Sequence, residues 1–254
     1  YGLIKPHLTW SVPQKYFDLH PIKRITLPPI KKGDLDDIPA FGKKLAKEVY
    51  DPSNGRNFAV KPNGDHANVM ANKQWRKAIQ AYLATISFAD AQIGRVLDAL
   101  DRSRHADNTI VVLWGDHGWH LGEKEHWRKH ALWEVSTRTP LVFTVPVKVA
   151  RNHEGMAKDK LCHRPVSLID IYPTLIDLCG LPKRKGLDGQ SLKPLLQNPT
   201  RQWERPALIT YGLNNHAVQT KRWRFIQYND GGQELYDHDR DPNERTNLAA
   251  KPKY

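Results

Sequence analysis

The segment 109–145 constrains the fold more than any other part of the chain. Its two ends, 109–114 and 141–145, are short apolar runs rich in β-branched residues. Runs of this kind that are bounded by turn residues are typical of buried strands. Between them lies a long loop, and loops of that length in compact domains are usually functional. The segment therefore predicts a strand, a loop that carries a site, and a second strand.

Asp116 and His117 are the candidate metal ligands in this loop. They follow the first predicted strand directly, where open α/β sheets usually place their ligands. Gly115 and Gly118 flank them and leave the backbone free to bend sharply, so both side chains can turn towards one ion. A hard divalent ion prefers the carboxylate, whereas the imidazole also suits zinc or another transition metal. The pair therefore predicts a metal site and leaves the metal open.

Cationic groups follow within a few residues. Lys124, His126, Arg128, Lys129 and His130 lie within seven positions, which suits an anionic substrate, although such a cluster can also be an ordinary solvated face. The net charge of +12 favours polyanionic partners through long-range attraction. No nucleic-acid-binding signature is present. No run approaches the roughly 18 apolar residues of a membrane helix. We therefore expect neither a nucleic-acid partner nor a membrane span.

The remaining pattern indicates a mixed α/β chain. Apolar residues at helical spacing predict a long helix over 74–102 whose stripe faces the core, and a second helix over 167–179 that Gly180 ends. Residues 1–4 are expected to end a strand, and 28–72 to form a long irregular insertion. From residue 205 onwards, short alternating runs predict an antiparallel meander, with strands at 207–211, 216–220, 223–228 and 234–237.

Several stretches together carry a family resemblance. They are Gly115-Asp-His-Gly-Trp-His-Leu-Gly-Glu-Lys-Glu-His-Trp-Arg-Lys129, Thr137-Arg-Thr-Pro140, Tyr1-Gly-Leu-Ile-Lys-Pro-His7, Glu234-Leu-Tyr-Asp237 and Asp241-Pro-Asn-Glu244. The chain resembles the carboxyl-terminal half of a type I sulfatase of the alkaline phosphatase superfamily, closest to the iduronate-2-sulfatase-like branch. The resemblance implies an α/β fold: an alkaline-phosphatase-like sheet flanked by helices that lacks its amino-terminal part. It places that sheet in residues 1–200 and a small antiparallel β subdomain in 201–254.

The resemblance also implies an activity and roles for named residues. The family hydrolyses sulfate esters, here expected on a sulfated saccharide, with a formylglycine nucleophile held on a divalent cation that is usually calcium. Asp116 and His117 would bind that cation. His7 and Lys129 would act on the sulfate group as catalytic residues. The side chains with weaker claims to a substrate contact are Lys124, His126 and His216.

The nucleophile of the family is not found in this sequence. Neither Cys162 nor Cys179 is followed by the family's x-Pro-Ser-Arg pattern, and two cysteines do not decide the redox compartment. We expect the nucleophile and the other metal ligands in an upstream half of the same polypeptide, so that this chain alone is inactive. The family suggests a periplasmic, secreted or lysosomal location. Two alternatives stay open: a metal-dependent phosphatase or phosphonate hydrolase of the same superfamily, and a non-catalytic sulfated-glycan-binding protein.

Overall fold

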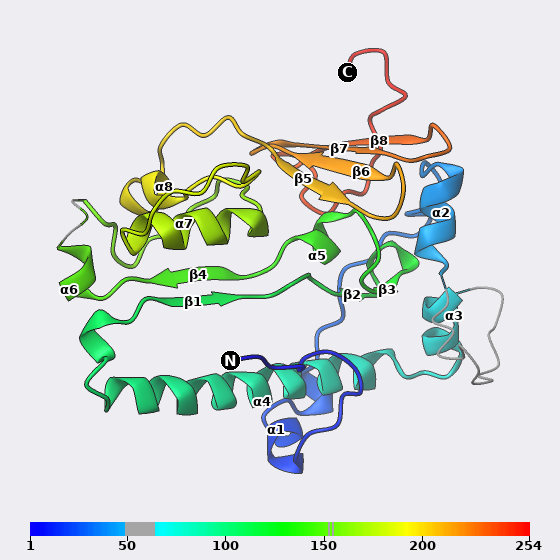
Figure 1. Ribbon diagram of the computed structural model, residues 1–254. Coiled ribbons are helices and arrows are strands. Elements are labelled where there is room, and N and C mark those ends of the chain that lie inside the picture. Colours follow the sequence, from blue (N-terminus) through cyan, green and yellow to red (C-terminus); the bar gives the residue numbers. More distant parts are fainter. Residues whose placement is uncertain (49–63, 152, 154) are drawn as a thin grey trace. The chain divides into compact units, whose positions relative to one another are not determined.

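The computed structural model describes residues 1–48, 64–151, 153 and 155–254 (Figure 1). The chain forms two compact units. Unit 1 comprises residues 1–32, 46–107 and 120–128, and unit 2 comprises residues 33–45, 108–119 and 129–254. Within the described ranges, no helix is both long enough and apolar enough to cross a membrane. The predicted division of the chain at residue 200 stays a prediction.

Unit 1 is built on the long helix α4 (Trp75–Asp101), which confirms the helix predicted from the apolar spacing (Figure 1). The short helix α1 (Gln14–Asp18) packs on it, and the ring of Tyr16 meets Phe88 edge-on at 5.4 Å between centroids. The turn η1 (Ile22–Arg24) follows. The buried centre of the unit consists of Ile25, Trp75, Ile79 and Trp127.

The prediction that the whole stripe of α4 faces the core is wrong for its later turns. Trp75 and Ile79 are buried, but Ile86, Val96 and Leu97 are 40%, 39% and 37% exposed. The side chains packed around Trp75 lie along the first turns, and the last buried residue of the helix is Ala89. Helical periodicity marks which residues share a face, but it does not say how far along the helix that face is covered.

Two further helices lie inside the region that was predicted to be irregular. They are α2 (Ala40–Ala46) and α3 (Gly64–Ala71), and residues 49–63 between them lie outside the described residues. In unit 1, α3 packs through His66, whose ring meets Trp75 edge-on at 5.0 Å and receives a hydrogen bond from Trp127 Nε1 at 3.1 Å. These tertiary contacts stabilise a helix that local periodicity does not indicate.

Unit 1 also contains a small hairpin. The strands β2 (His120–Leu121) and β3 (Trp127–Arg128) pair antiparallel around the turn η3 (Glu123–Glu125). Residues 1–4 do not form the predicted strand. A strand requires a hydrogen-bonded neighbour, and in the described part of the chain these residues belong to no sheet.

The turn η2 (Ala106–Asn108) precedes β1 (Val111–Trp114), and in unit 2 β1 pairs antiparallel with β4 (Leu141–Thr144). Both predicted strands are therefore present and lie side by side (Figure 1). The prediction that they are buried is wrong. Leu113 and Val142 face each other across the pair and are 39% and 49% exposed. A sheet of two strands has no further strands to cover its edges and faces.

The second predicted helix is confirmed as η4 (Leu168–Asp170) followed by α7 (Ile171–Leu178), and Gly180 with φ of +62° ends it in the expected left-handed conformation. Asp170 is buried at its start and accepts a hydrogen bond from Ser167 N at 2.9 Å in a capping box. Short helices of the unit include α5 (Glu134–Thr137), α6 (Val147–Ala150) and α8 (Lys193–Gln197).

The predicted meander is also confirmed. The strands β5 (Ala207–Thr210), β6 (His216–Gln219), β7 (Trp223–Gln227) and β8 (Gln233–Asp237) form one antiparallel sheet in that order. Side chains alternate between its faces, and the inner face buries Ala217, Ile226 and Tyr236 completely. The same face also buries Arg224 and Glu234. Charged groups at such positions require partners.

Candidate active site

Asp116 and His117 lie directly after β1 with their side chains adjacent. His117 Nε2 is 3.5 Å from Asp116 Oδ2. His117 Nδ1 lies 2.7 Å from the carbonyl oxygen of Gly118. A carbonyl oxygen can only accept a hydrogen bond, so in the neutral ring Nδ1 carries the proton and Nε2 presents its lone pair. Proteins commonly orient metal-binding histidines in this way. The loop therefore presents an imidazole nitrogen and a carboxylate oxygen side by side.

The glycines on either side of this pair allow the loop to approach neighbouring atoms closely. Gly118 N donates to Ser136 O at 2.8 Å, and a Cβ on Gly118 would lie 2.1 Å from Val135 O. A Cβ on Gly115 would lie 2.3 Å from Thr139 Oγ1. Neither glycine has a positive φ, so the sharp bend expected from the sequence is not their role. They let the loop lie against α5 and the residues after it.

The donors at this pair fit a divalent cation. Asp116 is 84% exposed and His117 is 23% exposed, so an ion could approach from solvent. Two donors fill only part of a shell, since zinc takes about four ligands and calcium about six to eight. Among the residues the structure describes, no group of three or more His, Cys, Asp or Glu side chains could hold a metal. The remaining ligands would have to come from other groups.

Lys129 is half-buried and lies between two residues with left-handed backbones. The φ angles are +75° at Arg128 and +62° at His130. Residues other than glycine rarely adopt this conformation, and it persists where surrounding contacts enforce it, often at functional sites. In unit 1, Arg128 donates to Asp65 Oδ2 from Nε at 3.1 Å and from Nη2 at 2.6 Å.

The residues after Lys129, 130–134, form what we call the anchored segment. Each of them makes a contact of its own within unit 2, either a ring stack or a hydrogen bond to the side chain or the backbone. The partners, in order along the segment, are Tyr211, Ser136, Arg224, Glu234 and Glu244. His130 begins it, with its ring stacked on Tyr211 at 5.6 Å between centroids. Leu132 and Trp133 are fully buried.

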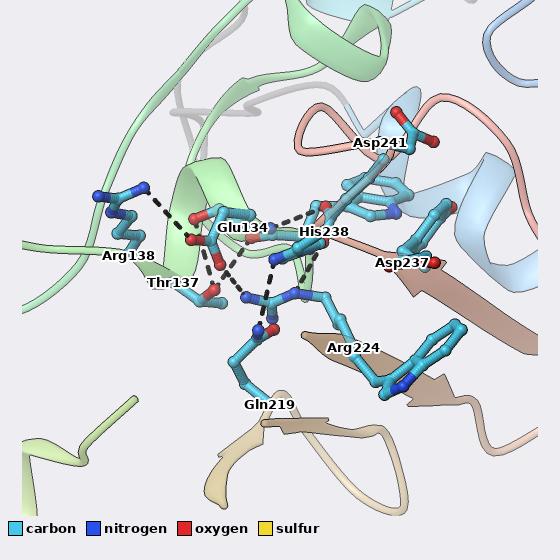
Figure 2. Close-up of polar contacts among 12 residues, drawn as sticks. Glu134, Thr137, Arg138, Gln219, Arg224, Asp237, His238 and Asp241 are labelled. Carbon is cyan, nitrogen blue, oxygen red and sulfur yellow. Dashed lines mark hydrogen bonds and ion pairs between the residues drawn. The ribbon is translucent and has the colours of Figure 1, made fainter. Parts of the chain in front are cut away.

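Arg224 is the centre of a buried charged cluster, and Figure 2 shows its guanidinium with Glu134 and His238 close by. The side chain is 1% exposed. Nη1 donates to Leu132 O at 2.9 Å, Nη2 donates to Glu134 Oε2, and Nε forms an ion pair with Glu244 Oε1 at 2.7 Å. His238 Nε2 lies 2.9 Å from the same Glu244 oxygen. We call Arg224, Glu134, Glu244 and His238 the Arg224 cluster.

Glu234 is a second buried anchor on the same sheet face. Its carboxylate accepts hydrogen bonds from Trp133 Nε1 at 2.8 Å, from Tyr228 OH at 2.7 Å and from Tyr236 OH. Burial, and then the charge of Glu234, raise the pKa of both Tyr228 and Tyr236 well above the ordinary tyrosine value. The two phenols are therefore fixed as donors to the carboxylate.

The other predicted site residues lie apart from this pair along the chain. In unit 2, His216 begins β6, its Nδ1 lies 2.9 Å from Thr210 Oγ1, and it lines a hollow of about 600 Å³ on the sheet. In unit 1, His7 is exposed, with Nδ1 2.9 Å from Leu8 O. Lys124 and His126 are only 2% and 1% exposed. Burial of these two side chains favours a structural role over a substrate contact.

The Arg224 cluster is not predicted from the sequence. One signal was available, because Arg224 occupies an inward position of a strand whose other inward residue, Ile226, is fully buried. A charge at such a position implies a buried partner. Glu244 lies in a stretch that contributed to the family resemblance. The pairing itself depends on tertiary contacts across about 90 residues, as with Arg224 and Glu134. Sequence spacing does not reveal such contacts.

Two family models match the sequence. One, described as Sulfatase, matches residues 39–181, and the other, described as N-sulphoglucosamine sulphohydrolase, C-terminal, matches residues 122–254. Each covers more than half of the chain. The chain belongs to the sulfatase family. Asp116, His117 and Lys129 all lie within the first matched region of this sulfatase chain.

Two relatives show how the sulfatase match is distributed. A sulfatase of Formosa agariphila is 42% identical over 253 residues, which are 100% of this chain and 46% of the relative. Human iduronate 2-sulfatase is 32% identical over 199 residues, which are 71% of this chain and 35% of the relative. The chain thus spans half or less of the length of either. The iduronate-2-sulfatase branch is one of several groups that match.

The fold of this sulfatase chain also matches a solved structure. Phosphonate monoester hydrolase of Agrobacterium radiobacter superposes with a TM-score of 0.77 and 24% identity, covering 98% of this chain and 52% of the hydrolase. At that identity the likeness concerns the fold alone. The predicted alkaline-phosphatase-like α/β fold with a small carboxyl-terminal antiparallel sheet is confirmed.

Proposed function

We propose that this chain is the carboxyl-terminal half of a sulfatase that hydrolyses the sulfate ester of a sulfated saccharide. The observation that carries the proposal is the Asp116–His117 pair. His117 Nδ1 is hydrogen-bonded to Gly118 O, and His117 Nε2 lies beside a carboxylate oxygen of Asp116. This pair lies within a sulfatase family match, and the cation-rich stretch that ends at Lys129 follows it.

The pair and Lys129 would act on different parts of the reaction. A divalent cation, for which we propose calcium, would neutralise charge that develops at the sulfate group. Asp116 and His117 would hold that ion. Lys129 would bind a sulfate oxygen and stabilise the charge that accumulates in the transition state. His7 would bind another sulfate oxygen or protonate the leaving group as a general acid.

We propose that the nucleophile lies outside residues 1–254. In the family it is a formylglycine made from cysteine or serine within a Cys-x-Pro-Ser-Arg pattern or its serine variant. Cys162 is followed by His-Arg-Pro-Val and Cys179 by Gly-Leu-Pro-Lys, and both are free thiols on the surface. Neither fits the pattern, so the proposed reaction requires the remainder of a longer polypeptide.

A sulfated saccharide is supported by charge and by the relatives. The net charge of +12 would draw a polyanionic substrate towards the protein. Human iduronate 2-sulfatase, named for a sugar acid, is 32% identical over its matched part. We therefore place the chain in the iduronate-2-sulfatase-like branch as the finer part of the proposal. A secreted, periplasmic or lysosomal location would agree with such a substrate.

The test uses the complete polypeptide that contains residues 1–254, supplied with calcium and with a sulfated disaccharide, an aryl sulfate or a phosphate ester. Ion chromatography measures free sulfate and free phosphate. We expect sulfate release that is lost in Asp116→Asn, because a neutral amide binds a cation more weakly than a carboxylate. Sulfate release that persists unchanged in this variant would contradict the role of the pair.

One specific observation favours a second candidate function. The fold superposes on a phosphonate monoester hydrolase with a TM-score of 0.77. A phosphatase or phosphonate hydrolase would use the same pair and lysine on a phosphorus centre. Release of phosphate, or of the alcohol from a phosphonate ester, without any release of sulfate would establish this candidate. If no substrate is turned over, a non-catalytic sulfated-glycan-binding protein becomes the better explanation.

A further inference from the structure

We propose that Arg224 is a positioning residue for Lys129, acting through the anchored segment 130–134. The inference rests on the proposed function, because it assigns Lys129 to the sulfate group. It concerns a buried side chain on the inner face of β7 that has no place in the mechanism described so far.

The connection between Arg224 and Lys129 is short. Lys129 is followed by His130 and Ala131, and the next carbonyl, that of Leu132, accepts a hydrogen bond from Arg224 Nη1 at 2.9 Å. The guanidinium also contacts Glu134, two residues further along. Arg224 thus contacts the anchored segment at Leu132 and at Glu134, both within five residues of Lys129. Because all of these residues belong to unit 2, the contacts form one continuous network.

The carboxylates hold the guanidinium in place. Glu244 Oε1 lies 2.7 Å from Arg224 Nε, and Glu244 Oε2 accepts a hydrogen bond from Glu134 N at 2.9 Å. His238 Nε2 lies 2.9 Å from the same oxygen, Glu244 Oε1. Glu244 therefore contacts both Arg224 and the backbone of the anchored segment. Movement of any one group would break contacts to the others.

The chemistry requires arginine. Its planar fork presents five N–H groups in fixed directions, and here Nη1 and Nη2 donate hydrogen bonds to Leu132 O and Glu134 Oε2 while Nε forms an ion pair with Glu244. A lysine at the same place carries the same charge as a single point on a flexible stem. A buried ion pair adds little net stability over well-packed apolar residues. The effect of Arg224 is therefore expected in the geometry that it fixes.

The first experiment is a double-mutant cycle in the complete polypeptide. Arg224→Lys is expected to lower kcat for sulfate release by roughly tenfold to a hundredfold, the scale on which a displacement of about 1 Å acts. In the Lys129→Ala background the same change is expected to cost less than about twofold, since the group that Arg224 positions is gone. An equal loss in both backgrounds would show that Arg224 acts on the protein in general, and would overturn the proposal.

Two variants serve as controls in this cycle. Arg222→Lys alters a neighbouring arginine that is 42% exposed and paired with Asp237, and it is expected to leave kcat unchanged. Glu244→Gln keeps the size of its side chain and removes the charge that faces Arg224. It is expected to show the same dependence on Lys129, and it decides the question if Arg224→Lys does not fold.

A second experiment does not depend on activity. Hydrogen–deuterium exchange followed by mass spectrometry compares the complete wild-type protein with Arg224→Lys. We expect faster exchange in peptides that cover residues 129–134 and unchanged exchange in the helix Ile171–Leu178. Unchanged exchange in residues 129–134 would overturn the positioning role. Absence of sulfate release from the wild type would instead contradict the proposed function, so the two failures are distinguishable.

Discussion

Lys129 lies between two residues with left-handed backbones. Arg128 and His130 each hold a left-handed φ, which costs on the order of 1–3 kcal/mol per residue for side chains other than glycine. Contacts on both neighbours offset this cost, since Arg128 binds Asp65 and His130 stacks on Tyr211. A lysine is a flexible cation, and this arrangement fixes the point from which it extends.

Replacement of Lys129 by alanine tests its role. We expect Lys129→Ala to lower turnover of the complete enzyme by a factor on the order of 10² to 10³, the loss seen when one donor to a developing negative charge is removed. Ion chromatography of released sulfate measures the effect. Lys221→Ala, at an exposed lysine in the same unit, is the matched control. Turnover near the wild-type rate in Lys129→Ala would show that this lysine does not contact the sulfate.

Tyr228 makes stability depend on alkaline pH. Burial, and then the charge of Glu234, raise its pKa in the folded state, whereas in the unfolded chain tyrosine titrates near pH 10. The unfolded state therefore loses its proton first. The stability that the neutral phenol contributes is fully present below about pH 10 and is lost as pH rises further.

The variant Tyr228→Phe isolates this effect. At pH 8 we expect it to lower the free energy of unfolding by about 1–3 kcal/mol, because Glu234 loses a buried donor. Between pH 10 and pH 11 its stability is expected to fall less steeply than that of the wild type. Urea denaturation at a series of pH values measures both. Parallel curves above pH 10 would mean that Tyr228 does not titrate as described.

At the scale of elements, the loop after β1 depends on its close approach to the backbone of α5. We expect Gly118→Ala to destabilise the protein by about 1–3 kcal/mol and to reduce sulfate release, because the new Cβ would displace the residues that follow His117. Gly94→Ala in α4 is the matched control, since nothing lies within 4 Å of its added Cβ. In a helix interior the control is expected to raise stability by roughly 0.5–1 kcal/mol. Thermal unfolding compares the two, and equal effects would contradict the packing argument.

Elements with a long or regular pattern could be predicted from the sequence. The helix α4 and the meander of β5 to β8 follow directly from helical spacing and from alternation. The short helices α2 and α3 could not be predicted, because in α3 the stabilising contacts come from side chains outside the helix, from Trp75 in the next helix and from Trp127, which is 61 residues from His66. Burial was overestimated for β1, β4 and the later part of α4, since periodicity does not reveal what covers a face.

Some features of the candidate site could likewise be predicted from the sequence, and others could not. Asp116 and His117 are covalent neighbours, so their proximity follows from the sequence, although the proton on Nδ1 that leaves Nε2 available requires the structure. Lys129 could be proposed from its surroundings in the sequence. The contacts of Arg224 with the segment after Lys129 could not be predicted, because Arg224 lies about 90 residues away in the sequence.

At the scale of the whole molecule, the net charge of +12 leads us to expect that the binding of a polyanionic substrate depends on salt. Attraction between this charge and a polyanionic saccharide is screened as ionic strength rises, and the Debye length falls to about 3 Å at 1 M salt. We expect KM for a sulfated oligosaccharide to rise several-fold between low salt and 0.5 M salt. KM for a small aryl sulfate with a single charge is expected to change much less. Equal salt dependence for the two substrates would contradict steering by net charge.

Residues 1–254 alone provide a further test. We expect the purified chain to release no sulfate from an aryl sulfate, because neither of its cysteines lies in the nucleophile pattern of the family. The complete polypeptide, assayed in parallel, serves as the positive control. Release of sulfate by the chain alone would show that the nucleophile lies within these residues and would require a different mechanism.

The anchored segment also sets a limit on changes in length. Its five successive positions each meet a different partner, so one inserted residue would shift all later contacts by one place. A substitution at one position leaves the other four contacts in register. The segment is therefore expected to tolerate the exchange of a side chain far better than an insertion or a deletion. Differences in loop length among related sulfatases are expected elsewhere, in regions such as residues 28–72.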